Sequence, residues 1–237
     1  MNPNDPNVAL LEVVANHLGA DLLGDLVFVG GAVAGLLITD PAMPAIRPTQ
    51  DVDLICSVLR VADYYRIGTR LKKRGFREDQ RPGAPTCRWC IGELAVDVMP
   101  TRSDILGFSN RWYPLAITTA QAMVLPSKRS IRVVAAPLFI ATKLEAFHGR
   151  GDGDHLFSHD LEDLVSIVDG RERLLEECRA SPPDLQDYLA HEISTLLATP
   201  AFVDALSGHL PADAASQQRL PQLRQKLQQI ANLRPTR

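Results

Sequence analysis

The feature that most constrains the fold is a change of pattern along the chain. Up to Val134, short β-rich runs alternate with helical spacing, whereas beyond Pro137 the apolar spacing is helical almost throughout. This order predicts an α+β protein, a mixed sheet with flanking helices followed by an all-helical C-terminal region, divided into 1–136 and 137–237. The expected strands are 26–29, 51–56, 86–91, 94–99 and 131–134. The expected helices are 8–18, 32–38, 60–74, 137–148, 159–169, 184–198 and 217–232.

Composition excludes several classes of protein. The 237 residues are 46% hydrophobic and 22% charged, which is an ordinary globular mix. The net charge of -3 argues against a polycation that coats nucleic acid. No apolar run approaches the ~20 residues of a membrane span, and MNPNDPN lacks the parts of a secretory signal, so we expect a cytoplasmic protein without a membrane partner. Cys87 and Cys90 have zinc-knuckle spacing but no second ligand pair, and we interpret them as two strand residues.

Gly30-Gly31 follows the predicted strand 26–29 and opens a helix. Two glycines let the backbone come very close to a ligand, and the first amides of a helix point at an anion. The motif alone is weak, because a Gly-Gly between strand and helix is more often a plain turn.

Asp51 and Asp53 alternate along the predicted strand 51–56, so they share one face while Val52 and Leu54 share the other. Neighbouring carboxylates repel each other, and a hard divalent cation would relieve that repulsion. The alternative is a solvent-facing edge strand.

Asp97 lies in the apolar strand 94–99, where burying an unpaired carboxylate is energetically unfavourable. If the two strands are neighbours, three carboxylates converge in the layout of a two-metal phosphoryl-transfer site.

Lys143 falls in the middle of the apolar arc when 138–148 is placed on a helix. Such a lysine either extends to an edge or reaches a buried anion. Asp160 lies at the edge of the apolar stripe of 159–169 and is the first candidate for that anion. It could equally be a first-turn acid that suits the helix dipole. We interpret Glu162 and Asp163 as solvated.

The combination of these pieces resembles the nucleotidyltransferase fold of the DNA polymerase beta superfamily. Arg47-Pro48-Thr49-Gln50-Asp51-Val52-Asp53-Leu54 is similar to a motif of abortive-infection (AbiEii/AbiGii) toxin-type nucleotidyltransferases. Ala141-Thr142-Lys143-Leu144-Glu145-Ala146-Phe147, Arg150 and Ser158-His159-Asp160-Leu161-Glu162-Asp163 are similar to that family's downstream motifs. The resemblance covers roughly 24–170. One departure is Ala32, where the superfamily often has Ser or Thr near the glycines, so backbone amides must hold the phosphate.

The resemblance implies a metal-dependent nucleotidyltransferase that transfers NMP from an NTP to a tRNA, another RNA or a protein. It implies a toxin of a toxin–antitoxin or abortive-infection system, with a possible cognate antitoxin as partner. Two Mg²⁺ ions would bind Asp51, Asp53 and Asp97, and Lys143 and Asp160 would join them as catalytic residues. Residues 1–136 would form the catalytic domain and 137–237 would complete the cleft. The implied nucleotide-binding residues are Gly30, Gly31, Arg47, Thr49 and Lys143.

Two alternatives stay open: a small-molecule (antibiotic) adenylyltransferase, and a non-catalytic nucleotide-binding module. One substitution follows from the interpretation of Lys143. Lys143→Met is expected to fold at least as stably as the natural protein and to lose most transfer activity.

The sequence from Ala214 onward contains five Arg or Lys and no acid. Leu220, Leu223, Leu227 and Ile230 lie on one helical face. We expect these apolar side chains to pack on the domain and the charges to stay in water; contact with an RNA backbone is the alternative.

Overall fold

The computed structural model describes residues 5–150 and 153–234, except for the side chain of Arg150. The chain forms two compact units. Unit 1 consists of Met1–Gly35 and Arg47–Ala135, and unit 2 consists of Leu36–Ile46 and Ala136–Arg237. Within the described ranges, no helix combines the length and apolar character that crossing a bilayer requires.

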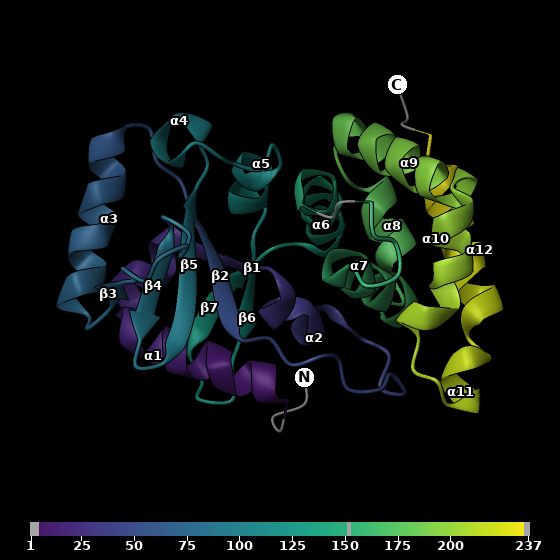
Figure 1. The fold of residues 1–237 in the computed structure, drawn as a ribbon, viewed down its shortest axis with the longest axis horizontal. Helices are drawn as coiled ribbons and strands as arrows, with labels where there is room; N and C mark the ends of the chain where they lie inside the picture. The colour runs from purple at the N-terminus through teal and green to yellow at the C-terminus, as the bar shows by residue number, and fades with distance from the viewer. Residues whose placement is uncertain (1–4, 151–152, 235–237) are drawn as a thin grey trace. The chain divides into compact units, whose positions relative to one another are not determined.

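Unit 1 is built on a seven-stranded sheet in its described residues, with strand order β3-β4-β5-β2-β1-β7-β6 (Figure 1). The sheet is mixed, because β2 is antiparallel to β1 but parallel to β5, and β1 is parallel to β7. The strands are β1 Leu26–Val29, β2 Asp51–Cys56, β3 Arg77–Glu78, β4 Arg88–Ile91, β5 Leu94–Pro100, β6 Gln121–Val124 and β7 Ser130–Val133.

Helices of unit 1 cover both faces of this sheet. They are α1 Pro6–Asp25, η1 Gly31–Val33, α2 Ala34–Leu37 (which runs on into unit 2), α3 Val61–Lys73, α4 Ser103–Leu106 and α5 Tyr113–Thr118. Asp5 caps α1 by accepting from the Asn7 amide, and Pro6 is tolerated at the first turn because its missing N–H has no helical partner. Arg70 of α3 pairs with Asp25 of α1 at 2.5 Å, so these two helices lie side by side.

The two faces of the sheet differ in character. Gly68 of α3 packs against the Trp89 ring, which shares a face with Val52 through the pairing of β4, β5 and β2. The opposite face carries Met99, whose sulfur lies 3.2 Å from the Tyr113 hydroxyl of α5. Asp53 is on the same face as Met99, because strand side chains alternate. The predicted carboxylates therefore project from the face opposite to α3.

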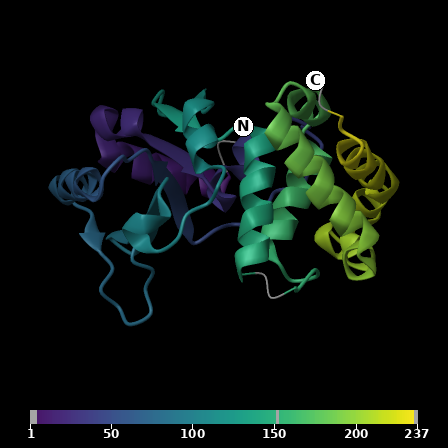
Figure 2. The ribbon, with the colours of Figure 1, turned by 90° about the horizontal axis from the view of Figure 1, so that it is seen from above.

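Unit 2 is helical in its described residues, and Figure 2 shows α9 and α12 packed side by side. The segment Leu36–Ile46 belongs to this unit: the Gly170 carbonyl accepts from the Thr39 and Asp40 amides at 3.0 Å each. The helices are α6 Ala136–Arg150, α7 His159–Gly170, α8 Leu174–Arg179, α9 Pro183–Ala198, α10 Pro200–Ala205, η2 Leu206–His209, α11 Ala214–Gln217 and α12 Leu220–Ala231.

The predicted α+β class is confirmed, and strands 26–29 and 51–56 have the predicted bounds. The predicted strand 86–91 is shorter, because β4 begins at Arg88. The predicted helix 32–38 is a 3₁₀ turn followed by four α-helical residues. The predicted helix 217–232 is also too long. α12 begins at Leu220 with Pro221 in its first turn, where proline is tolerated while it blocks extension backwards.

Candidate active site

The turn after β1 admits no residue larger than glycine. Gly30 has φ 70° and ψ −172°, a backbone conformation that L side chains rarely adopt. A Cβ built on Gly30 would lie 1.9 Å from Oδ2 of Asp53. The Asp53 carboxylate therefore packs directly on the Gly30 backbone, which brings two of the sequence-predicted pieces together. Gly31 opens η1, and the Ala32 that follows it is buried.

The three predicted carboxylates share one face of adjacent strands. Asp53 of β2 is the register partner of Asp97 of β5, and Asp51 lies two residues earlier on β2. Partners in register project to the same side of a sheet, so all three side chains do. Asp97 is buried, with 8% of its surface exposed, whereas Asp51 and Asp53 are half-buried. The condition stated for the sequence, that strand 94–99 is a neighbour of strand 51–56, is met, because β5 pairs with β2.

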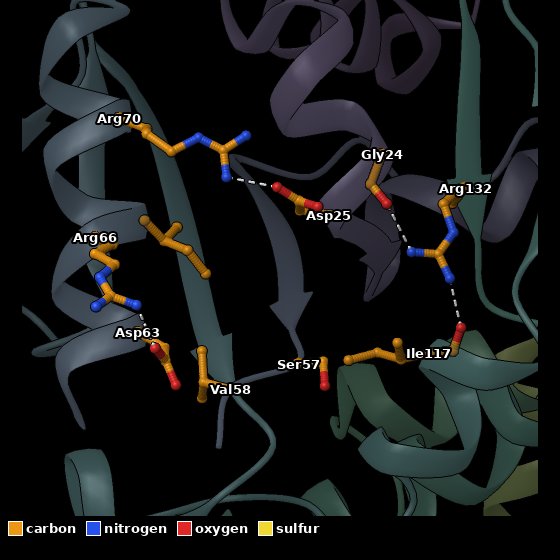
Figure 3. Close-up of a pocket in the computed structure, with 10 residues that line it drawn as sticks. Gly24, Asp25, Ser57, Val58, Asp63, Arg66, Arg70, Ile117 and Arg132 are labelled. Carbon is orange, nitrogen blue, oxygen red and sulfur yellow. Dashed lines mark hydrogen bonds and ion pairs between the residues drawn. The ribbon is translucent and has the colours of Figure 1, made fainter. Parts of the chain in front are cut away.

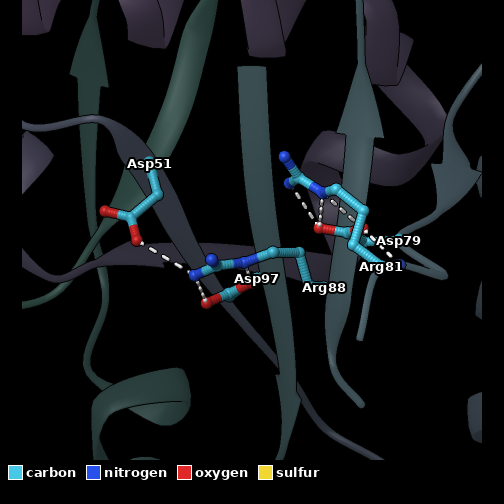
Figure 4. Close-up of polar contacts among 5 residues, drawn as sticks. All are labelled: Asp51, Asp79, Arg81, Arg88 and Asp97. Carbon is cyan, nitrogen blue, oxygen red and sulfur yellow. Dashed lines mark hydrogen bonds and ion pairs between the residues drawn. The ribbon is translucent and has the colours of Figure 1, made fainter. Parts of the chain in front are cut away.

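The Arg88 side chain lies beside these carboxylates, although no motif of the sequence pointed to it. Its guanidinium donates from Nε to Asp97 Oδ1 and from Nη2 to Asp97 Oδ2, both at 2.8 Å, and from Nη2 to Asp51 Oδ2 at 3.2 Å (Figure 4). Hydrogen bonding to Asp97 raises the pKa of Arg88 above its usual value, and the charges of Asp97 and Asp51 add to this. The site thus contains a guanidinium that bridges two strands.

A signal for Arg88 was present in the sequence. The hairpin around Gly92-Glu93 pairs Ile91 with Leu94, and counting outward along the antiparallel strands pairs Arg88 with Asp97. Opposite charges directly across an antiparallel pair attract. The predicted hairpin therefore contained this ion pair, which its register reveals.

The three carboxylates are of the ligand type that divalent cations prefer. Among residues 5–150 and 153–234, no three His, Cys, Asp or Glu side chains form a group that could hold a metal ion in the arrangement seen. However, Asp51, Asp53 and Asp97 supply the hard oxygen donors that Mg²⁺ prefers. A guanidinium already lies between two of them, which shows that this part of the sheet attracts a cation.

Arg47 and Thr49 lie just before β2. The Thr49 amide donates to Asn7 Oδ1 at 2.9 Å, and its hydroxyl donates to the Asp51 carbonyl at 3.0 Å. The Arg47 carbonyl accepts from the Asn7 side-chain amide at 3.1 Å. Asn7 of α1 thereby anchors the segment that leads into the carboxylate strand. The contacts give Thr49 a role in positioning the start of β2.

Unit 2 contains a second charged cluster, on α6 and α7. The expectation that an anion lies beside Lys143 is confirmed: its Nζ is 3.1 Å from Asp160 Oδ1. Nζ also lies 2.6 Å from Asp163 Oδ2 and 5.7 Å from the centre of the Phe139 ring. All three charged residues are less than 10% exposed. Ser158 caps α7 by accepting from the Leu161 amide at 3.3 Å, which fixes the turn that carries Asp160.

The interpretation of Asp163 as solvated is wrong. Asp163 is 6% exposed and lies closer to the lysine than Asp160 does. Asp160 and Asp163 are three residues apart, so both project from one side of α7 toward α6. The projection misplaced Asp163 because α7 is buried over a wider arc than its apolar stripe: Ile167 and Gly170, four and seven residues further on and so on the same side as Asp163, are buried too. One ammonium therefore faces two buried carboxylates.

Unit 1 also has a charged depression of about 410 Å³ at the other ends of β1 and β2 (Figure 3). Three arginines line it, and each has partners within the protein. Arg66 pairs with Asp63 at 2.9 Å and Arg70 with Asp25 at 2.5 Å. Arg132 donates to the carbonyls of Gly24 and Ile117. The Arg66 pair lies within α3, the Arg70 pair joins α3 to α1, and Arg132 of β7 joins α1 and α5. We assign the depression no ligand.

No protein-family model matches the chain, and no curated protein matches it significantly. Among solved structures, the chain is similar to JHP933 from Helicobacter pylori, with 14% identity and a TM-score of 0.46 over 94% of this chain and 89% of that one. It is also similar to an H. pylori protein suggested to be a nucleotidyltransferase, with 13% identity and a TM-score of 0.48 over 98% of this chain and 96% of that one. Structural similarity this distant supports no conclusion about activity.

Proposed function

We propose that this protein is a nucleotidyltransferase that uses divalent cations to transfer NMP from an NTP to an acceptor. The observation that carries the proposal is the contact between the Gly30 backbone and the Asp53 carboxylate, with Asp97 beside Asp53 in register. A glycine backbone lets phosphates approach closely, and clustered carboxylates can bind the cations that accompany a triphosphate.

In this proposal each residue has a distinct task. Asp51, Asp53 and Asp97 would hold two Mg²⁺ ions, which would supply positive charge to neutralise the triphosphate and the oxygens that gain charge during transfer. Gly30 and Gly31 let the phosphates approach the backbone. Asp97 also helps to orient the acceptor hydroxyl. The acceptor hydroxyl gives up its proton to Asp97, and from there to water, as its oxygen bonds to the α-phosphorus. The bond from the α-phosphorus to the bridging oxygen of the β-phosphate breaks, and pyrophosphate leaves with that oxygen.

We further propose an RNA acceptor, such as a tRNA, and membership in the AbiEii/AbiGii toxin type. Support comes from the residues that resemble that family, Arg47, Thr49, Lys143 and Asp160, which would serve the nucleotide and its transfer. The basic helix α12 is a weaker support, because its Lys226 already donates to the Asp169 carbonyl and Arg219, just before the helix, is paired with Asp169 and Asp40. A protein acceptor is the alternative to RNA, and label in a protein of the lysate would indicate it. A cognate antitoxin is the partner that a toxin of this type would have.

The direct test is a labelling experiment. The protein is incubated with Mg²⁺ and each of the four α-³²P-labelled NTPs, together with total RNA, a cell lysate or an aminoglycoside. We expect label to enter RNA with one preferred NTP. Label in the aminoglycoside would instead indicate an antibiotic adenylyltransferase, and label in no acceptor would contradict the proposed activity.

Asp51→Asn and Asp53→Asn are the matched variants for this assay. Each keeps the size of the side chain and removes one carboxylate from the set, so we expect transfer to fall at least about 100-fold, as for loss of a major transition-state contact. The melting temperature should change little, because both side chains are half-buried and their mutual repulsion is relieved. Full activity in either variant would exclude the metal role.

One observation favours a second candidate, a non-catalytic nucleotide-binding module. The bidentate ion pair of Arg88 with Asp97 engages the carboxylate that the reaction needs. A protein of this kind would bind nucleotide in equilibrium dialysis and transfer no label to any acceptor.

A further inference from the structure

We propose that Arg88 is a built-in counter-cation that competes with the divalent cation for Asp97 and Asp51, and so sets how tightly the site binds metal. This inference rests on the metal site of the proposed function. It makes Arg88 a residue that determines the metal affinity of the site, and Arg88 lies outside the motifs that carry the family resemblance.

The geometry supports competition because the guanidinium uses the same oxygens that a metal would need. Both Asp97 oxygens accept from Arg88 at 2.8 Å, and one Asp51 oxygen accepts at 3.2 Å. The planar fork of an arginine matches a carboxylate in this bidentate form, which is among the stronger hydrogen-bonded pairs in proteins. A cation that takes Asp97 as a ligand must therefore displace at least one of these bonds.

The position of Arg88 is imposed by the sheet. It is the first residue of β4 and is paired in register with Asp97, which is paired in turn with Asp53. Three neighbouring strands thus place an arginine and two aspartates in one row on one face. The Arg88 side chain is 23% exposed and that of Asp97 is 11% exposed, so water screens their attraction only partly.

The charge of Arg88 also acts on the metal directly. A guanidinium within hydrogen-bond distance of a metal-ligating carboxylate repels a divalent cation bound to that carboxylate. Removing the charge should strengthen metal binding, even though it removes a stabilising ion pair. A purely structural role for Arg88 predicts a different result, in which the protein loses stability but its affinity for metal stays the same.

The test measures binding of Mn²⁺ alone, without nucleotide, from the electron paramagnetic resonance signal of the free ion. Wild type is compared with Arg88→Gln and Arg88→Lys. Arg81→Gln is the matched control, because Arg81 forms a bidentate pair with Asp79 on the segment leading into β4 and contacts neither Asp51 nor Asp97 in Figure 4. Asp53→Asn reports whether the Mn²⁺ occupies the proposed site.

We expect Arg88→Gln to lower the Mn²⁺ dissociation constant by about tenfold or more, as the loss of a nearby like charge predicts. Arg88→Lys keeps the charge but loses the fork, so its value should lie between those of wild type and Arg88→Gln. Arg81→Gln should match wild type, and Asp53→Asn should bind Mn²⁺ more weakly. In chelator, Arg88→Gln should melt below wild type, and Mn²⁺ should raise its melting temperature by more than it raises that of wild type.

The outcomes distinguish failure of the proposed role of Arg88 from failure of the proposed metal site. Equal Mn²⁺ affinity in wild type and Arg88→Gln overturns the role of Arg88 and leaves the metal site in place. Mn²⁺ binding that Asp53→Asn does not weaken, or no binding by any variant, overturns the metal site and this inference with it. If Arg88→Gln does not fold, Arg88→Lys decides, and an affinity equal to that of wild type overturns the inference.

Discussion

At the scale of single residues, Gly30 is the position where a one-carbon change should matter most. Gly30→Ala would place a methyl group 1.9 Å from Asp53 Oδ2 and force an L side chain to φ 70°. Either the backbone or the carboxylate must move. We expect a loss of about 1–3 kcal/mol in the free energy of unfolding and a loss of nucleotide transfer that exceeds the effect on stability. Thermal melting and the labelling assay measure the two effects separately.

Gly92→Ala is the control for Gly30→Ala. Gly92 also has a positive φ, 58°, but a Cβ there would meet nothing within 4 Å. It should show the cost of backbone strain without any loss of transfer. If Gly30→Ala behaved in the same way as Gly92→Ala, the contact with Asp53 would have no bearing on activity.

The charged residues of the two clusters show what the sequence could and could not reveal. Asp51, Asp53 and Asp97 were identifiable because charges in apolar strands are costly and alternation fixes their face. Arg88 was identifiable only by counting the register of a hairpin. The burial of Asp163 depends on how α6 packs on α7, which the periodicity of one helix does not define.

At the scale of elements, the predicted strands were those with strong local signals. β1 is a run of four apolar residues that ends at glycine, and the β4–β5 hairpin turns at Gly92 with a positive φ. β3 and β6 went unpredicted. β3 has only two residues, and β6 is exposed at three of its four positions, so neither has an apolar period. Both are edge strands that form through pairing with a neighbour.

The packing of α6 on α7 changes the expectation for Lys143→Met. The notion of a single acid beside Lys143 is incomplete, because Asp160 and Asp163 both form ion pairs with this ammonium. Removing one partner of a buried charge cluster typically costs about 3–5 kcal/mol, so the variant should be markedly less stable than wild type. Chemical denaturation monitored by circular dichroism measures this loss.

Two further variants isolate the effect of Lys143. Lys143→Met/Asp163→Asn also removes the charge of one of the two neighbouring carboxylates, which relieves their mutual repulsion and should recover part of the lost stability. Lys73→Met removes an exposed lysine and should leave stability nearly unchanged. If Lys143→Met were as stable as wild type, the cluster would contribute nothing to the fold. Transfer by the double variant then reports on the proposed role of Lys143 in catalysis.

At the scale of the whole molecule, the change of pattern near residue 135 marks the point where the chain passes from unit 1 to unit 2. Spacing along the sequence could show this because strands and helices have different apolar periods. It could not show that Leu36–Ile46, which precedes β2, belongs to the helical unit. That segment is mostly loop, and its place is set by tertiary contacts such as those of Thr39 and Asp40 with Gly170.

The contribution of this segment can be tested with two fragments and a third that serves as the control. One contains 136–237 alone, and the other has 36–46 joined to it through a flexible linker. Leu36 and Leu37 are buried in the native chain, and Asp40 pairs with Arg219 at 2.8 Å. Burying a leucine contributes about 1.5–3 kcal/mol. We therefore expect the joined fragment to melt at least about 5 °C above 136–237 alone, given ~4–8 °C per kcal/mol for domains of this size.

Replacing 36–46 by a Gly/Ser stretch of equal length should remove this gain in melting temperature. Equal melting temperatures for all three fragments would mean that α6 to α12 form a complete core and that the segment only rests on it.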